Sequence, residues 1–348
     1  MLKFSIIGCG RIAKNHLQAA TENNLSIVAL CDINDIAFDV DAPHYTCYKT
    51  MIAERKPDLV AIATDSGSHA EIACYCIQQG VHVIIEKPMA MSIAEADQII
   101  SLAQKHQVKV SVCHQNRYNL AVQQVREATV AGHFGKLSHA TVHVRWNRSQ
   151  DYYTQAPWRG TWAKDGGALM NQCIHGIDLL QWLVNSDVTE VYAVTKNQQH
   201  PYLEVEDVGL ALVKFANGAI ATIEGTTNVY PENLEETIYL FGGTGTAKLG
   251  GKSVNTIEVW NFENAEGTVM VEDVPNIYGN GHARLYSDWI QAIINDTEAP
   301  CNPTEGKKAL ELILAIYKSS KEGLPVQLPL EDFASIDMKG FFDESSRK

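Results

Sequence analysis

The sequence lacks the features of membrane, secreted and nucleic-acid-binding proteins. Its longest apolar runs, such as 59–63 and 81–85, are far shorter than the ~20 residues of a transmembrane helix. The chain enters a predicted strand within its first residues, so we expect no secretory signal. Basic residues are scarce: 28 Lys and Arg against 41 Asp and Glu give a net charge of −13, whereas nucleic-acid readers usually show the opposite balance. We therefore expect a cytoplasmic protein that binds neither nucleic acid nor membrane.

The eight cysteines show no metal-binding or disulfide spacing. Only Cys74 and Cys76 lie close together, and their spacing matches neither a zinc site nor a C-x-x-C redox motif. The chain also has no H-E-x-x-H, G-x-S-x-G or Walker-type string. We expect reduced cysteines in the core and no metal site.

The first 115 residues alternate short apolar runs with segments of helical periodicity. This order predicts a parallel sheet with helices on both faces. The expected strands are 4–7, 27–31, 59–63, 81–85 and 108–112. One expected helix covers residues 93–105, with Ile99, Ile100 and Leu102 on one side.

The second part of the chain is richer in strands. A helix over 120–130 leads to a strand over 138–146 and a helix over 165–183. Further strands are expected at 190–195, 208–215, 219–225, 236–241, 246–249 and 256–262, and helices at 283–295 and 304–321. Turns at Asn217-Gly218 and Gly242-Gly243 indicate an antiparallel meander. The 348 residues, at ~150 per domain, thus divide into an α/β domain over 1–118 and a second α/β domain over 119–348.

A G-x-G-x-x-A turn follows the first strand and opens a helix, the arrangement of a dinucleotide-binding site. An acidic residue, Asp32, ends the next strand, 22 residues after Gly10. A carboxylate there accepts hydrogen bonds from both ribose hydroxyls and repels a 2′-phosphate, which favours NAD over NADP. The predicted cofactor contacts are Gly8, Gly10, Arg11, Ile12, Ala13 and Asp32.

Loops at the carboxyl ends of parallel strands are where ligands bind. The loop after the third strand offers Thr64 and His69 to the cofactor, although His69 would serve equally well as a structural residue at a helix start. Glu86 and Lys87 follow the fourth strand, and we expect both to contact the cofactor as well. Lys87 can assist deprotonation of a substrate hydroxyl while Glu86 orients the loop, but an ordinary surface ion pair would explain the two residues as well.

A Gly-rich segment carries Asn171, His175 and Asp178 on one face of the helix expected at 165–183. Histidine can take a hydroxyl proton because its pKa lies near neutral pH, although a lone helical histidine is usually structural. Asp178 is either a supporting residue or a plain helix contact.

Other polar and aromatic side chains suit a nucleotide-bearing anion or loop packing. Asn116 and Arg117 follow the fifth strand, within reach of nicotinamide or substrate. Trp158 and Arg159 supply an aromatic face and a cation, and Tyr152 can line a sugar pocket.

Taken together, the G-x-G-x-x-A turn, the Glu86-Lys87-Pro88 string and His175 with Asp178 resemble the Gfo/Idh/MocA oxidoreductase family over the whole chain. The resemblance implies an N-terminal Rossmann domain and a C-terminal α/β domain with an open, largely antiparallel sheet that often mediates oligomers. It also implies NAD(P)-dependent oxidation of a sugar or cyclitol hydroxyl, with Lys87 and His175 at the reacting group.

Many family members have an Asp where this chain has Asn171. An amide cannot take a proton, so acid–base work should rest on Lys87 and His175, with Asn171 positioning the substrate. Which of the two is the base stays open.

The segments 156–175 and 225–231 resemble the UDP-N-acetylglucosaminuronate 3-dehydrogenases of bacterial surface-polysaccharide (lipopolysaccharide) synthesis. That resemblance implies oxidation at C3 of UDP-2-acetamido-2-deoxy-D-glucuronate. Because exposed sheet faces are normally covered, we also expect a homotetramer or homodimer. Similar enzymes retain the cofactor and reoxidise it with 2-oxoglutarate. The expected substrate contacts are Lys87, Arg117, Tyr152, Arg159, Asn171 and His175.

Two alternatives stay open. One is oxidation of UDP-N-acetylglucosamine, a cyclitol or a free sugar by the same chemistry. The other is an NAD-binding sensor without turnover, which the joint presence of Lys87 and His175 disfavours.

Overall fold

The computed structural model describes residues 1–35, 37–251, 253–264, 271 and 281–343. They form two compact units, one of Met1–His114 with Gly281–Lys307 and the other of Gln115–Asn280 with Lys308–Lys348. None of the described helices is long and apolar enough to cross a membrane.

The first unit is built on a six-stranded, fully parallel sheet with the order β3-β2-β1-β4-β5-β6. This confirms the predicted doubly wound α/β fold. The strands are β1 (Lys3–Ile7), β2 (Ser26–Cys31), β3 (His44–Tyr45), β4 (Leu59–Ile62), β5 (His82–Ile85) and β6 (Val110–Val112). The two-residue β3 was not anticipated, because a strand that short has no periodicity to detect.

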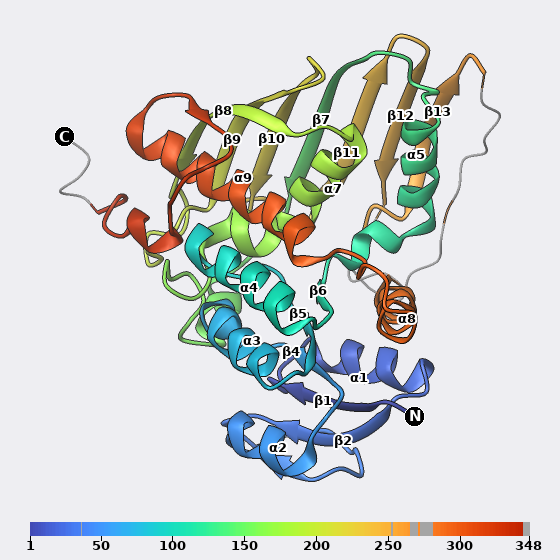
Figure 1. Ribbon diagram of the computed structural model, residues 1–348. Helices are drawn as coiled ribbons and strands as arrows, with labels where there is room; N and C mark the ends of the chain where they lie inside the picture. The colour runs from blue at the N-terminus through green and yellow to red at the C-terminus, as the bar shows by residue number, and fades with distance from the viewer. Residues whose placement is uncertain (36, 252, 265–270, 272–280, 344–348) are drawn as a thin grey trace. The chain divides into compact units, whose positions relative to one another are not determined.

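The helices of this unit lie on both faces of the sheet. They are α1 (Ala13–Glu22), α2 (Tyr48–Arg55), α3 (His69–Gln78), α4 (Ile93–His106) and α8 (Gly281–Ile294). Figure 1 shows α1 and α8 on one side of the strands and α3 and α4 on the other. The C-terminal segment 281–307 therefore contributes to the N-terminal unit, which the sequence does not reveal.

The second unit is built on an eight-stranded sheet with the order β13-β12-β11-β7-β10-β9-β8-β14. All neighbouring strands are antiparallel except β7 and β10, which pair in parallel. The strands are β7 (Leu137–Arg145), β8 (Val188–Lys196), β9 (Val208–Phe215), β10 (Ile220–Thr226), β11 (Glu235–Gly242), β12 (Gly245–Gly250), β13 (Thr256–Phe262) and β14 (Val326–Gln327). The largely antiparallel sheet is as predicted, but the meander is interrupted because β7 lies between β10 and β11.

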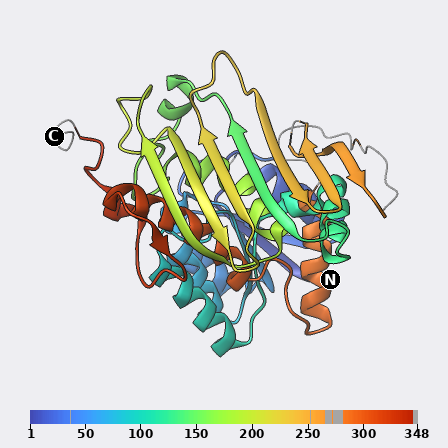
Figure 2. The ribbon, with the colours of Figure 1, turned by 90° about the horizontal axis from the view of Figure 1, so that it is seen from above.

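Helices cover one face of this sheet. They are α5 (Leu120–Val130), α7 (Ile174–Val184) and the second-unit part of α9 (Pro303–Glu322). On β9 the side chains alternate between buried and exposed. In Figure 2 the other face of the sheet is turned toward the viewer, with no described helix in front of its central strands.

The helix expected from residue 165 begins later and in two parts. A π-helical turn, η3, covers Leu169–Cys173, and α7 continues as an α-helix. Gly166 and Gly167 have φ angles of 78° and 93°, which the interior of an α-helix does not contain, so Gly166 ends the preceding loop and helical structure begins only at Gly167. A π-helical turn often marks a functional site.

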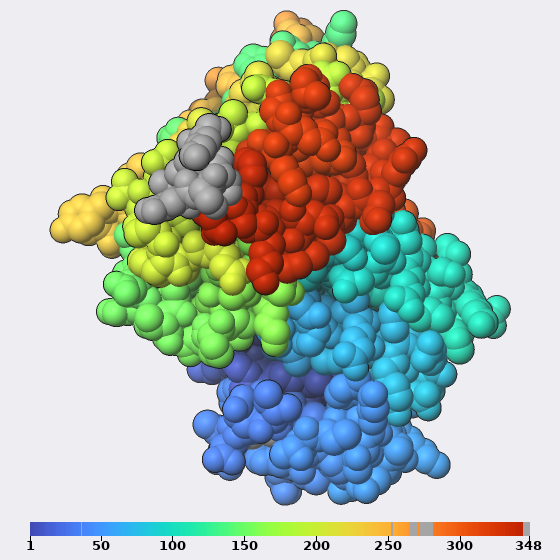
Figure 3. All heavy atoms as spheres, turned by 90° about the vertical axis from the view of Figure 1, so that its left-hand side faces the viewer, coloured from blue at the N-terminus to red at the C-terminus, as the bar shows by residue number. Residues whose placement is uncertain are grey.

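The short α6 (Gln150–Thr154) and the 3-10 turns η1 (Ser66–Ser68), η2 (Gln115–Tyr118) and η4 (Ser335–Met338) complete the described elements. The segment after α9 packs on the loop before η3: Ser335 donates a hydrogen bond of 2.7 Å to the Trp162 carbonyl, and the Phe342 and Trp162 rings stack. Figure 3 shows this red C-terminal segment beside the green residues of that loop.

Candidate active site

The glycine turn between β1 and α1 has the shape of a dinucleotide site. Gly8 has a φ of 94°, and a Cβ there would lie 2.4 Å from the carbonyl carbon of Ala63, so only glycine fits. At Gly10 an added Cβ would meet no atom within 4 Å, which leaves room for a ligand to approach the backbone. Helix α1 begins at Ala13 without a side-chain cap, and such an N-terminus attracts phosphate. The turn therefore fits the pyrophosphate of NAD, with Arg11 and Ile12 between Gly10 and the helix.

Asp32 follows β2 and is held beside this turn. Its Oδ2 accepts a hydrogen bond of 2.7 Å from the Cys9 amide, and its Oδ1 accepts one of 2.8 Å from the Asn34 amide. The carboxylate thus lies at the glycine turn, where it suits the ribose hydroxyls of NAD and disfavours the 2′-phosphate of NADP. Burial, followed by the charge of Asp32, raises the pKa of the Cys9 thiol to about 12, so this thiol stays neutral.

His69, the first residue of α3, links two loops at the carboxyl edge of the sheet. Its Nδ1 lies 2.8 Å from the Pro88 carbonyl oxygen and its Nε2 lies 3.2 Å from that of Thr64. Burial lowers the pKa of His69, so the neutral ring donates one N–H. The shorter distance favours Pro88 as the acceptor. This geometry supports a structural role for His69, and its contact with the cofactor stays a prediction, as does that of Thr64.

Glu86 and Lys87 do not form an ordinary surface pair, because the Glu86 side chain is only 8% exposed. Its Oε1 lies 2.9 Å from His16 Nε2, and its Oε2 accepts a hydrogen bond of 3.2 Å from the Lys87 amide. The carboxylate thus holds the backbone of the residue that the sequence singles out for catalysis. A contact between Glu86 and the cofactor stays a prediction.

In the second unit, Arg117 forms a buried ion pair with Asp178. Arg117 Nε donates to Asp178 Oδ2 at 2.8 Å and a terminal nitrogen donates to Oδ1 at 2.6 Å, with side chains 6% and 2% exposed. This bidentate pair ties η2 to α7. His175, also on α7 and 9% exposed, has its Nε2 at 3.4 Å from Gln115 Nε2. Asn116 is buried, and its Oδ1 has no hydrogen-bond partner among the described residues, so an amide acceptor is left for a ligand.

Asp165 fixes the orientation of Asn171. It is 2% exposed and accepts hydrogen bonds from the Gly160 amide, at 2.6 Å, and from Asn171 Nδ2. A carboxylate accepts hydrogen bonds, so the nitrogen of the Asn171 amide has to face Asp165. Asn171 Oδ1 in turn accepts a hydrogen bond of 3.1 Å from Gln172 Nε2. Asn171 thus offers an oxygen acceptor, which suits its predicted role in positioning a substrate.

Two arginines flank one tyrosine ring near this network. The Arg159 guanidinium lies 4.0 Å from the Tyr152 ring centroid and that of Arg148 lies 5.2 Å from it. Arg159 also lies 5.4 Å from the Trp158 ring, and its Nε is buried without a hydrogen-bond partner among the described residues. Arg148 Nε donates to Gln172 Oε1 at 2.9 Å. Such a cluster of cations and aromatic faces can bind an anionic, nucleotide-bearing ligand.

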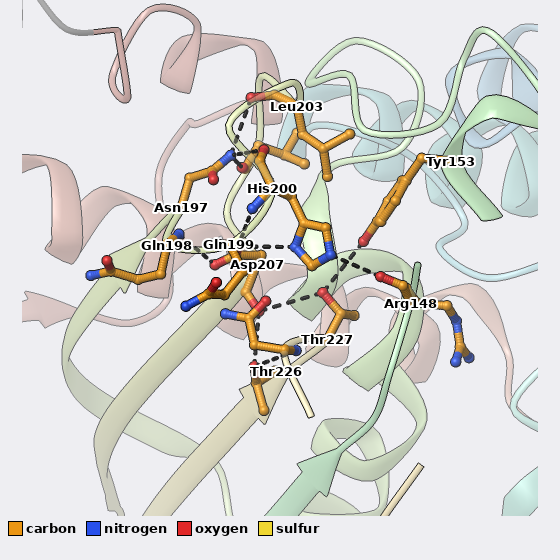
Figure 4. Close-up of polar contacts among 12 residues, drawn as sticks. Arg148, Tyr153, Asn197, Gln198, Gln199, His200, Leu203, Asp207, Thr226 and Thr227 are labelled. Carbon is orange, nitrogen blue, oxygen red and sulfur yellow. Dashed lines mark hydrogen bonds and ion pairs between the residues drawn. The ribbon is translucent and has the colours of Figure 1, made fainter. Parts of the chain in front are cut away.

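A second polar network supports the backbone of Arg148 (Figure 4). The Asp207 carboxylate is buried and accepts from the backbone amides of Gln198, Gln199 and His200 and from His200 Nδ1. Burial alone would raise the pKa of Asp207, but these hydrogen bonds lower it. His200 Nε2 then donates to the Arg148 carbonyl at 2.8 Å. The loop between β8 and β9 thereby fixes the segment that carries the arginine.

Comparison with known proteins identifies the family. A family model described as an oxidoreductase family with an NAD-binding Rossmann fold matches residues 2–114, and a GFO/IDH/MocA C-terminal domain matches residues 122–248. The chain belongs to the Gfo/Idh/MocA oxidoreductase family. It is an NAD-dependent oxidoreductase, and the family predicted from the sequence is confirmed.

Two solved structures are similar over almost the whole chain. The WlbA dehydrogenase of Bordetella pertussis, crystallised with NADH and UDP-GlcNAcA, is 36% identical with a TM-score of 0.87, covering 95% of this chain and 99% of that one. The WlbA dehydrogenase of Chromobacterium violaceum, with the same ligands, is 35% identical with a TM-score of 0.86, covering 95% and 96%. A more distant relative, D-apiose dehydrogenase of Paraburkholderia graminis, is 25% identical over 94% of this chain and 89% of its own.

For this member of the Gfo/Idh/MocA family, the structure adds residues that sequence reasoning did not assign. Asp165 orients Asn171, Gln172 links Asn171 to Arg148, and His16 contacts Glu86. The one available signal was the place of Asp165 and Gln172 in the same Gly-rich segment as Asn171. His16 gave none, because its partner is 70 residues away.

Proposed function

We propose that this oxidoreductase oxidises the C3 hydroxyl of UDP-2-acetamido-2-deoxy-D-glucuronate (UDP-GlcNAcA) to the 3-keto sugar nucleotide. The observation that carries the proposal is the similarity, at 35–36% identity over 95% of the chain, to two dehydrogenases crystallised with NADH and this sugar nucleotide. The arginines around Tyr152 supply the positive charge that such an anionic substrate requires.

In the proposed reaction NAD, when bound, accepts the hydride from C3. Lys87 or His175 takes the hydroxyl proton, since both side chains can exchange protons near neutral pH when their surroundings adjust the pKa. Asn171 cannot take a proton and instead accepts a hydrogen bond from a substrate donor through Oδ1, the orientation that Asp165 imposes. Holding the substrate in register supplies much of the rate enhancement.

Arg117 and Arg159 are both expected substrate contacts, and the geometry favours Arg159 as the partner of the uronate carboxylate. Arg117 already donates hydrogen bonds from Nε and one terminal nitrogen to Asp178. Arg159 donates from one terminal nitrogen to the Tyr152 carbonyl at 2.7 Å, but its buried Nε has no hydrogen-bond partner among the described residues. An arginine that binds a carboxylate through two nitrogens distinguishes a uronate from neutral UDP-N-acetylglucosamine.

We also propose that the chain forms a homo-oligomer through the uncovered face of the eight-stranded sheet. Apolar side chains on β8, β9 and β10 are strongly exposed there: Tyr192, Val194, Leu210, Leu212 and Ile220, the last two at 60% and 57%. A contiguous apolar patch of this kind marks an interaction surface, and a dimer or tetramer would cover it. Leu212→Glu should then lower the molar mass measured by light scattering, and an unchanged mass would contradict this interface.

With this substrate the enzyme would act in bacterial surface-polysaccharide sugar synthesis, with 2-oxoglutarate as the final hydride acceptor. The second candidate is oxidation of a free sugar or cyclitol, which the similarity to D-apiose dehydrogenase supports at lower identity.

Mass spectrometry tests the substrate directly. The purified protein is incubated with NAD, 2-oxoglutarate and, in separate reactions, UDP-GlcNAcA, UDP-N-acetylglucosamine, D-apiose and inositol. Product lighter by two hydrogens from the uronate alone supports the proposal. Product from another compound would identify that compound as the substrate of the same type of reaction. No product from any of them, with NAD still bound, would favour the NAD-binding sensor without turnover.

A further inference from the structure

Four side chains from distant parts of the first unit converge on the Glu86 carboxylate. His16 comes from α1, His282 and Tyr286 from α8, and Cys113 directly follows β6. All are buried, with His16, Cys113 and Tyr286 completely so. The proposed function uses none of them.

The hydrogen bonds form a chain that ends at the backbone of Lys87. Tyr286 Oη lies 2.7 Å from His16 Nδ1, and His16 Nε2 lies 2.9 Å from Glu86 Oε1. Glu86 Oε2 then accepts from the Lys87 amide at 3.2 Å. A carboxylate can only accept here, so His16 Nε2 carries a proton and donates it to the hydrogen bond. Burial raises the pKa of Tyr286 well above its usual value, so its hydroxyl keeps its proton.

We propose that His16 and Tyr286 are positioning residues, which hold Glu86 in its ionised form and thereby fix the loop that presents Lys87. Helix α8, which comes almost 200 residues later in the sequence, thus helps to position the loop at Lys87 through Tyr286. The inference rests on the proposed role of Lys87 in the reaction.

Electrostatics agree with this geometry. Burial alone would raise the pKa of Glu86, but the hydrogen bond from His16 and the nearby charge of Lys87 lower it below its usual range. His282 Nε2 lies 4.0 Å from Glu86 Oε1, and burial lowers the pKa of His282 to about 4, so this ring is neutral at pH 7. The Cys113 thiol, whose pKa burial raises, hydrogen-bonds Glu86 as a neutral donor.

The same residues offer an alternative that the experiment has to separate. His16, Glu86, Cys113 and His282 have potential metal ligand atoms within 4.8 Å of one another. Both ring nitrogens of His16 already lie at hydrogen-bond distance from Tyr286 and Glu86, and Cys113 would have to lose a tightly held proton. The hydrogen-bond chain therefore explains the cluster better than a cation does.

A pair of variants at one position tests the proposal. In His16→Gln the amide nitrogen replaces Nε2 as the donor to Glu86, whereas the shorter side chain of His16→Asn loses that contact. In His16→Asn the buried Glu86 carboxyl loses its His16 donor and should take up a proton, so its pKa rises above the unfolded value. The variant would then be ionised at Glu86 only when unfolded, and stability should fall as pH rises.

We therefore expect the deficit in Tm of His16→Asn against wild type to grow between pH 5 and pH 8. The deficit of His16→Gln should stay constant over the same range. His106→Asn, in the last turn of α4, takes no part in this chain and serves as the matched control. Because this arm uses no substrate, it is valid even if UDP-GlcNAcA proves not to be the substrate.

In turnover, His16→Asn should lower kcat about tenfold or more with little change in the KM for NAD, whereas His16→Gln should remain within about threefold of wild type. If His16→Asn does not fold, Tyr286→Phe replaces it, and a kcat equal to that of wild type would overturn the role of Tyr286. Equal, pH-independent losses in both His16 variants would overturn the proposal. So would a stoichiometric metal found by elemental analysis of the wild-type protein and lost in His282→Ala.

Discussion

Glu206 makes the stability of the second unit depend on pH in a direction opposite to that of ordinary carboxylates. The residue precedes β9 and is completely buried, with Oε1 accepting hydrogen bonds from the Leu169 amide at 2.8 Å and from Tyr317 Oη at 2.9 Å. Its Oε2 has no partner among the described residues. The effect of burial on the pKa of Glu206 outweighs the opposite effect of these hydrogen bonds, and the pKa rises from 4.5 to about 8.

The sign of the effect follows from proton linkage. Between pH 4.5 and 8 the folded chain keeps a proton on Glu206 and the unfolded chain does not, so folding takes up a proton. The free energy of unfolding should fall by about 1.4 kcal/mol per pH unit from this residue, or about 5 kcal/mol over the whole range, and level off above pH 8. Glu206→Gln removes the ionisation and preserves the acceptor at Oε1. The variant should match wild type near pH 5 and be more stable than wild type near pH 8.

Urea unfolding followed by tryptophan fluorescence at pH 5, 6, 7 and 8 measures this difference. Glu232→Gln is the matched control, because Glu232 is exposed and this substitution makes the same chemical change at the surface. A difference between Glu206→Gln and wild type that is the same at every pH would refute the reasoning, since it would mean that Glu206 does not titrate in this range.

Three further predictions concern the reaction, the cofactor and the core. Lys87→Ala should lower kcat at least about 100-fold while calorimetry shows that NAD still binds; near-normal turnover would remove Lys87 from the chemistry. Asp32→Ser should reduce the preference for NAD over NADP in kcat/KM about tenfold or more, and an unchanged ratio would remove Asp32 from the ribose site. Arg117→Met should lower the free energy of unfolding, measured by chemical denaturation, by about 3–5 kcal/mol, because it leaves Asp178 charged and buried. The double variant that also carries Asp178→Leu should recover most of that loss. A loss below about 1 kcal/mol in Arg117→Met would contradict the buried pair.

The sequence predicts the architecture well where local patterns determine it. Apolar runs mark β1, β2, β4, β5 and β6, because strands buried on both faces have few polar residues. The β9 and β13 bounds agree with the predicted 208–215 and 256–262. Periodicity reports only which side of an element is buried, so it could not show that α8 joins the first unit or that β7 separates β10 from β11.

The candidate site residues can be picked out from the sequence where a motif carries them. Asp32 and Lys87 stand out because each lies just after a strand, at the ligand edge of a parallel sheet. The partners that orient the site are separated along the chain: His16 from Glu86 by 70 residues and Arg117 from Asp178 by 61. Such pairs leave no local pattern, so only the folded structure reveals them.

Transfer of deuterium from C3 of the sugar tests the central claim most directly. UDP-GlcNAcA carrying deuterium at C3 is incubated with the protein and NAD without an added hydride acceptor. The cofactor is then released, and its mass is measured by mass spectrometry. The account predicts reduced cofactor that carries one deuterium, together with a 3-keto sugar nucleotide that has lost it. Reduced cofactor without deuterium would contradict oxidation at C3, and cofactor that stays oxidised in the presence of this substrate would contradict the proposed substrate.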